Sequence, residues 1–121
     1  MIAYHLVEPV VEGIHEFQFI AVGRSIFGRV GLSAKDTKVA SIRQLYVAPD
    51  SRKQGIGKEL VRLCIYQAAT EGCESINLTV AKSNEQVIPF YKKLGFILCA
   101  DFGDEVWMCR PIHKKDKELS L

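Results

Sequence analysis

Residues 45–63 read LYVAPDSRKQGIGKELVRL, and the fold follows from this stretch. Its first three residues, an apolar leucine followed by an aromatic and a β-branched residue, predict a strand, which Pro49 ends because proline cannot donate to a sheet ladder. A short basic loop follows. Apolar residues from Ile56 onward then recur at the spacing of one helical face, so a helix is expected. The stretch predicts a strand, a glycine loop and a helix in direct succession.

This arrangement is typical of an anion-binding site. The first N–H groups of a helix have no partner within it, and the helix N-terminus carries partial positive charge. Gly55 and Gly57 let a ligand approach the backbone without a Cβ in the way. Arg52, Lys53 and Lys58 add full positive charges at the same point. We therefore expect a phosphate or diphosphate as the ligand.

Two common phosphate-binding loops do not fit the stretch, and the glycines could instead serve only a tight turn. A Walker A loop needs four residues between its glycines and then Lys-Ser or Lys-Thr, whereas here one residue separates the glycines and Glu59 follows Lys58. A dinucleotide-binding loop needs a small residue three positions after its second glycine, and Leu60 occupies that position.

Two motifs together resemble those of one enzyme family. Arg52, Gly55 and Gly57 have the spacing R-x-x-G-x-G after a strand, and residues 84–96 read NEQVIPFYKKLGF, which fits N-x(6)-Y-x-K-x-GF. Both are similar to the CoA-binding segments of the GNAT superfamily of acyl-CoA-dependent N-acyltransferases. The resemblance covers roughly residues 17–110.

The resemblance implies a set of residues that bind acetyl-CoA. Backbone groups of Leu45 and Val47 would face the pantetheine arm or the thioester carbonyl. The loop and helix start would surround the diphosphate, mostly through backbone N–H groups. Asn84 would contact the pantetheine or pyrophosphate region, with a turn or capping role as the alternative. The implied cofactor residues are Leu45, Val47, Arg52, Lys53, Gln54, Gly55, Ile56, Gly57, Lys58, Asn84 and Tyr91.

Tyr91 is the candidate catalytic residue, because the family commonly uses a tyrosine here as general acid. Amine attack on a thioester expels a thiolate, and a thiol pKa of about 8.5 lies close enough to a phenol pKa of about 10 for proton transfer. The alternative is a half-buried aromatic whose hydroxyl only bonds to the sulfur or the backbone.

No general base is evident in the sequence. Some family members place a glutamate where this chain has Ser41, and Ser is no base; Gln44 on the same strand could orient a water. An amine of pKa about 10.4 is mostly protonated at neutral pH, so help with deprotonation is expected. Further candidates, by residue type alone, are His5, Glu12, His15, Glu16 and Asp36.

Composition bounds the class of protein. Hydrophobic residues make up 48% and charged residues 25% of 121 residues, as in a soluble globular domain. The net charge of +2 is too small to suggest nucleic-acid binding, and no apolar run is long enough for a membrane span. The four cysteines lack a C-x-x-C pair, so we expect no metal. Without a secretion signal, they are expected to be free thiols in the cytoplasm.

Along the chain, the pattern predicts a mixed α/β fold of the GNAT type. Strands are expected at residues 1–7, 17–22, 26–33 and 39–47, at 75–80, and near 96–102 and 106–110; helices are expected from Ile56 to Gly72 and from Val87 to Gly95. A right-handed crossover makes strands 41–47 and 75–80 parallel, in an otherwise mainly antiparallel sheet. We expect one domain, 1–112, followed by a charged, frayed tail, 113–121.

The chain departs from the family at its N-terminal end. GNAT proteins normally place two helices between their first two strands, where these help to wall the acceptor site, and fewer than ten residues are available here. The acceptor site would then be open, or completed by a second subunit in a homodimer.

The function implied is N-acetylation of an amine by acetyl-CoA, through direct attack in a ternary complex. The acceptor, whether small molecule, peptide or protein, is not readable from the sequence. The alternative is a non-catalytic module that senses acyl-CoA or contacts a partner.

Overall fold

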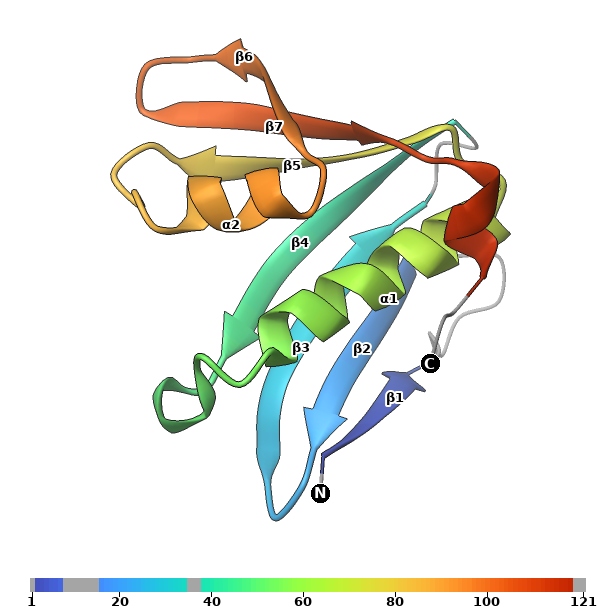
Figure 1. Cartoon of the computed structure of the whole chain (residues 1–121), viewed down its shortest axis with the longest axis vertical. Coiled ribbons are helices and arrows are strands. Elements are labelled where there is room, and N and C mark those ends of the chain that lie inside the picture. The colour runs from blue at the N-terminus through green and yellow to red at the C-terminus, as the bar shows by residue number, and fades with distance from the viewer. Residues whose placement is uncertain (1, 8–15, 35–37, 119–121) are drawn as a thin grey trace.

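The part of the chain that the structure describes forms a seven-stranded sheet with two α-helices on one side (Figure 1). The structure, a computed structural model, describes residues 2–7, 16–34 and 38–118. The strand order is β1-β2-β3-β4-β5-β7-β6, and only the β4–β5 pair is parallel. The predicted fold class is confirmed.

The elements lie close to their predicted positions. The strands are β1 (Ala3–Val7), β2 (Glu16–Val22), β3 (Ile26–Ser33), β4 (Val39–Val47), β5 (Ser75–Ala81), β6 (Ile97–Asp101) and β7 (Glu105–Pro111). The helices are α1 (Ile56–Thr70) and α2 (Val87–Lys93), with short 3₁₀ helices η1 (Pro49–Ser51) and η2 (Lys114–Lys117). Gly72 and Gly95, just beyond the two α-helices, have positive φ, as expected for residues that follow a helix end.

The core lies between the sheet and α1. Alternate residues of each central strand face the helix, and the buried face of α1 includes Ile56, Leu60 and Cys64. The chain approaches closely at Gly28, where an added Cβ would lie 3.0 Å from the Tyr46 carbonyl oxygen and 3.1 Å from a methyl group of Leu60.

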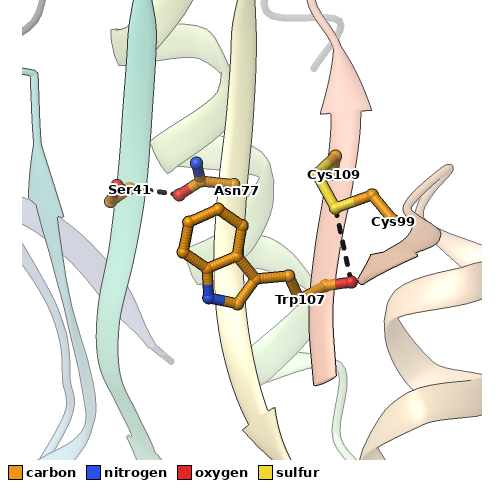
Figure 2. Close-up of a disulfide and its surroundings, with 5 residues drawn as sticks. All are labelled: Ser41, Asn77, Cys99, Trp107 and Cys109. Carbon is orange, nitrogen blue, oxygen red and sulfur yellow. Dashed lines mark hydrogen bonds between the residues drawn. A yellow bond between two sulfur atoms is a disulfide. The ribbon is translucent and has the colours of Figure 1, made fainter. Parts of the chain in front are cut away.

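The parallel pairing of β4 and β5 is short. It covers only residues 39–41 against 75–77, so the rest of β4 diverges from β5 (Figure 1). At the last pair, the Ser41 hydroxyl donates to Asn77 Oδ1 at 2.8 Å (Figure 2). The predicted parallel crossover is confirmed, but over three residues of each strand rather than most of their length.

One face of the sheet is uncovered by the described residues. Both α1 and α2 lie on the same side of the sheet (Figure 1), and in Figure 2 α1 is seen behind the strands, whose near face carries Ser41, Asn77 and Trp107. We call this the open face. The segment between β1 and β2, where the helix-poor connection was predicted, lies outside the described residues.

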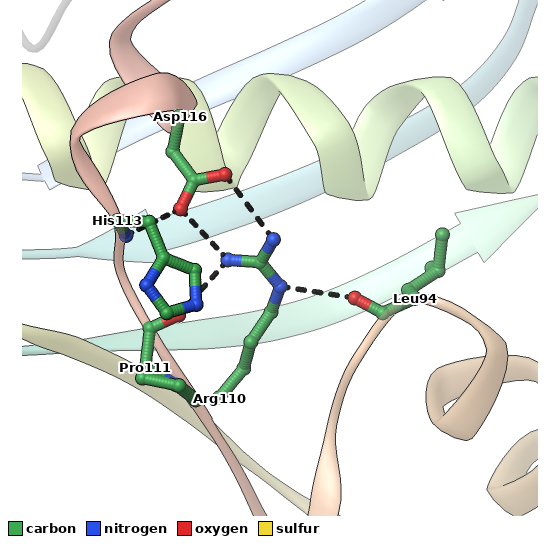
Figure 3. A network of polar contacts seen from close by, with 5 residues as sticks. All are labelled: Leu94, Arg110, Pro111, His113 and Asp116. Atoms are coloured by element: carbon green, nitrogen blue, oxygen red, sulfur yellow. Dashed lines mark hydrogen bonds and ion pairs between the residues drawn. The ribbon is translucent and has the colours of Figure 1, made fainter.

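Arg110 of β7 holds the end of α2 and the C-terminal segment together (Figure 3). Its Nε donates to the Leu94 carbonyl at 3.0 Å, and its terminal nitrogens bind the Asp116 carboxylate at 3.0 and 3.2 Å. Burial alone would raise the pKa of Asp116, but hydrogen bonds from Arg110 and the His113 backbone N–H, with the arginine charge, lower it.

The prediction of a frayed tail is wrong for residues 114–117, which form η2 beside α1 (Figure 1).

The expectation of four free thiols is also wrong. Cys99 and Cys109 form a disulfide between the neighbouring strands β6 and β7, with their Cα atoms 6.1 Å apart (Figure 2). The two lie ten residues apart in the sequence. In the antiparallel hairpin Cys109 pairs with Ile97, and Cys99 lies at the register shift of β6, so the disulfide joins the two strands diagonally. Cys64 and Cys73 are buried in the core and form no disulfide.

Among the described residues, neither α-helix combines the length and the apolar character that crossing a membrane requires.

We expect Gly28→Ala to lower the free energy of unfolding by about 1–3 kcal/mol, because the added methyl group meets backbone and core atoms that cannot move away freely. Urea unfolding measures this. Gly57→Ala is the control, since a Cβ there would lie 3.5 Å or more from its neighbours and the residue is helical. Equal losses in both variants would contradict the close approach at Gly28.

Candidate functional site

A groove of about 510 Å³ lies where the end of β4, the start of α1 and α2 meet. We call it the β4–α2 groove. It is lined by Leu45, Tyr46, Val47, Ser51, Arg52, Lys53, Gly55, Ile56, Gly57, Lys58, Asn84, Gln86, Val87 and Phe90. The structure thus gathers nine of the eleven predicted cofactor residues around one space, from segments separated by about thirty residues in the chain.

The N-terminus of α1 forms one end of this groove. Gly55 precedes the helix with φ +79°, a left-handed conformation that suits glycine. The first hydrogen bond of the helix runs from the Glu59 N–H to the Gly55 carbonyl at 3.0 Å. The N–H groups of residues 56–58 precede that bond and therefore remain available to an anion.

The basic side chains of the loop differ in their placement. Arg52 folds back over the end of β4, where its Nε donates to the Val47 carbonyl at 3.1 Å. Lys53, with φ 66°, and Lys58 are both exposed at the groove. Gln54 does not line the groove; its side-chain amide donates to the Asp50 carbonyl at 3.4 Å. Three positive charges therefore border one space.

The opposite wall comes from α2 and the loop before it. Asn84 is exposed in this loop, and its backbone N–H donates to the Ala81 carbonyl at 3.0 Å, which is a turn contact. Its side chain lines the groove together with Phe90. Asn84 therefore combines the turn position that the sequence left as an alternative with access to a ligand.

Tyr91 is not among the residues that line the groove. Only 4% of it is exposed, and its ring packs edge-on against Phe90 and Phe96, with ring centres 5.0 and 5.4 Å away. Burial, and secondarily the Cys64 thiol, raises the pKa of Tyr91 far above that of an ordinary phenol. The Tyr91 hydroxyl is therefore a weaker acid than the ordinary phenol, of pKa about 10, on which the expected proton transfer was based.

A bulge interrupts β4 next to the groove. Arg43 pairs with Gly31 and Tyr46 with Arg29, so two residues of β4, Gln44 and Leu45, lie opposite one residue of β3. Gln44 has φ 53°, a left-handed backbone conformation that residues other than glycine adopt only at a cost in free energy. The bulge bends β4 where it leaves β5, and so it contributes to the opening between the two strands.

A second groove, of about 190 Å³, lies beside the bulge. Its lining includes Glu16, Gln18, Arg29, Gly31, Ser33, Arg43 and Gln44. Of the base candidates within the described residues, Glu16 lines this groove, and His5 is exposed on β1. Glu12, His15 and Asp36 lie outside the described residues.

A comparison with family models matches residues 7–96 to the acetyltransferase (GNAT) family.

The chain belongs to the GNAT acetyltransferase family.

Individual proteins of this family match shorter parts of the chain. An uncharacterized N-acetyltransferase of Methanocaldococcus jannaschii is 41% identical over 59 residues, which cover 49% of this chain and 26% of that protein. Thialysine N-epsilon-acetyltransferase of Bos taurus is 33% identical over 54 residues, which cover 45% of this chain and 32% of that protein. The match thus spans about a quarter to a third of these relatives.

The fold also matches solved GNAT structures. A GNAT family acetyltransferase from Elizabethkingia anophelis, with acetyl-CoA bound, superposes with a TM-score of 0.77 at 15% identity, over 91% of this chain and 97% of that one. At this identity the match shows that the two chains share the fold.

Five residues that line the β4–α2 groove were not predicted from the sequence: Tyr46, Ser51, Gln86, Val87 and Phe90. The position of Phe90 directly before Tyr91 is the signal that could have placed it on the groove side of α2. Nothing in the sequence indicated that Tyr46 lines the groove, because alternation along a regular strand puts its side chain on the face opposite those of Leu45 and Val47.

Gln44→Gly tests the strained bulge. We expect a gain of about 0.5–1 kcal/mol in the free energy of unfolding, because relief of the left-handed conformation outweighs the extra chain entropy of glycine. Arg43→Gly, one residue earlier in the same strand, should instead lose about 0.5–1 kcal/mol. Thermal unfolding of both variants decides this, and a loss at Gln44 equal to that at Arg43 would contradict a left-handed Gln44.

Proposed function

We propose that this chain is an acetyl-CoA-dependent N-acetyltransferase that acts on an amine by direct attack in a ternary complex. The observation that carries the proposal is the β4–α2 groove, in which the open N-terminus of α1 and three basic side chains border the space beside the diverging end of β4. The acetyl-CoA bound to the related Elizabethkingia protein supports the same ligand here.

The described residues suit such a ligand. The N–H groups of residues 56–58 and the side chains of Lys53 and Lys58 would hold the diphosphate. Because β4 pairs with β5 only through Ser41, the backbone groups of β4 that face β5 beyond this point are free of that strand. Leu45 and Val47 would use them to bind the pantetheine arm or the thioester carbonyl.

In the reaction, the neutral amine attacks the carbonyl carbon of the thioester, a C–N bond forms, and the C–S bond breaks. The nitrogen that attacked loses a proton to solvent water, and the CoA thiolate that leaves takes up one proton. Tyr91 is the proposed proton donor, since it lies on α2 directly after Phe90, which lines the groove. Burial raises the pKa of Tyr91 and so keeps its hydroxyl protonated, which lets it hydrogen-bond to the thiolate as it develops, before the proton is transferred.

A non-catalytic acyl-CoA sensor is the second candidate function. The observations that favour it are the buried Tyr91 and Ser41, which stands where some family members carry a glutamate and whose hydroxyl is engaged by Asn77. The acceptor could be a small amine or the amine of a peptide or protein; the name of the Bos taurus relative makes a lysine-like amine a reasonable first acceptor to assay.

We expect purified protein to bind both acetyl-CoA and CoA with micromolar affinity in calorimetric titration. Lys58→Gln should weaken both about fivefold, because one charge next to the diphosphate is lost. Lys92→Gln, an exposed lysine of α2 that does not line the groove, is the matched control and should bind as the parent does. Absence of binding up to millimolar ligand by folded protein would overturn both candidate functions.

Tyr91→Phe separates catalysis from sensing. For an acetyltransferase, we expect CoA release with a lysine-like amine to fall at least about tenfold in kcat, because proton donation or hydrogen bonding to the sulfur is lost, while the affinity for acetyl-CoA stays within about twofold. Phe90→Leu reports on packing of the same helix. Equal loss of binding and turnover would assign Tyr91 a structural role only.

A further inference from the structure

The second groove, beside the β4 bulge, has an unusual floor. Gly31 of β3 pairs with Gln18 of β2 on one side and with Arg43 of β4 on the other. A Cβ on Gly31 would lie 3.3 Å from the Arg43 carbonyl and 3.6 Å from the Arg43 Cβ, so the missing side chain leaves a hollow between longer neighbours. We call this hollow the arginine groove.

Two arginines border the arginine groove. Arg43 and Arg29 are both exposed and come from adjacent strands, at successive pairs of the β3–β4 ladder. The Arg29 guanidinium lies over the Tyr46 ring, 5.8 Å from its centre, which restricts its movement. Within the described residues neither guanidinium makes an ion pair, and the acidic residue of the lining, Glu16, belongs to the start of β2.

The two grooves approach each other at β4. Gln44 lines the arginine groove, and Leu45, the next residue, lines the β4–α2 groove. Tyr46, which lines the β4–α2 groove, also lies under Arg29. Only Gln44, the residue with positive φ in the bulge, separates Arg43 from Leu45 along β4. An anion between the arginines would therefore lie close to a group held at Leu45.

We propose that the arginine groove is the acceptor subsite, and that it selects amines which carry an anionic group, a carboxylate or a phosphate. This inference rests on the proposed acetyl transfer. Arg29 and Arg43 would bind the anion by charge-assisted hydrogen bonds, and Gln18 and Ser33 would add neutral polar contacts. The amine of the same molecule would then be directed toward the thioester at Leu45. The volume of about 190 Å³ fits a small anionic group.

Matched amines test this selectivity. With acetyl-CoA, we expect lysine to be acetylated with a kcat/KM about tenfold above that of lysinamide, and phosphoethanolamine above ethanolamine; the two pairs distinguish carboxylate from phosphate. Arg29→Gln and Arg43→Gln should remove the preference and leave the acetyl-CoA affinity unchanged. Arg24→Gln, an exposed arginine in the β2–β3 turn outside the groove, is the matched control and should keep it. Equal rates within each pair in the parent protein would overturn the subsite.

A binding measurement keeps the test decisive when none of these amines is acetylated. Titration of the CoA-loaded protein with glutamate or inorganic phosphate should shift the arginine Nε–H NMR signals of Arg29 and Arg43 and leave that of Arg24 unchanged. Absence of these shifts, or equal shifts at Arg24, would overturn the subsite. Failure of the protein to bind CoA would instead refute the proposed function itself, so the two failures are distinguishable.

Discussion

The separation of β4 from β5 is the constraint on which the site depends. A continuous parallel pair would satisfy the backbone groups of β4 along its whole length and leave no space between the strands. Here the pairing ends at Ser41 and Asn77, whose side chains bond across the last pair. Beyond that point the bulge at Gln44 bends β4 away. The β4–α2 groove occupies the space that results.

The remaining architecture supports that opening. The α1 helix packs along β2, β3 and β4 through a continuous apolar face, and this fixes its N-terminus at the end of β4, where the groove begins. Gly28 permits the close approach between β3, β4 and α1. On the other side, Arg110 fastens the end of α2 and η2 to β7. The two walls of the groove are therefore held by separate contacts, and the strands between them are free to diverge.

The two grooves lie next to each other along β4, in a sheet that has one uncovered face. In this GNAT fold, α1 and α2 share one side, and the described residues leave the other side of the sheet exposed. The arginine groove lies beside the bulge, and the β4–α2 groove starts one residue further along β4. A donor and an acceptor could thus approach Leu45 from different grooves. The positive charge has different sources in the two grooves: a helix N-terminus with Arg52, Lys53 and Lys58 in the β4–α2 groove, and Arg29 with Arg43 in the arginine groove.

The sequence by itself determined the elements, their order and the loop chemistry. Gly55, Gly57 and the basic residues between 52 and 58 are adjacent in the chain, and local geometry places them at a helix start whatever the remainder does. Tertiary structure alone decided the rest. The bulge at Gln44, the Cys99–Cys109 disulfide, the burial of Tyr91 and the meeting of Arg29 with Arg43 all depend on which strands become neighbours and in which register. Pairing across a sheet joins residues that are far apart in the chain, and a bulge shifts the register locally, so the neighbours of one residue are not readable from a local motif.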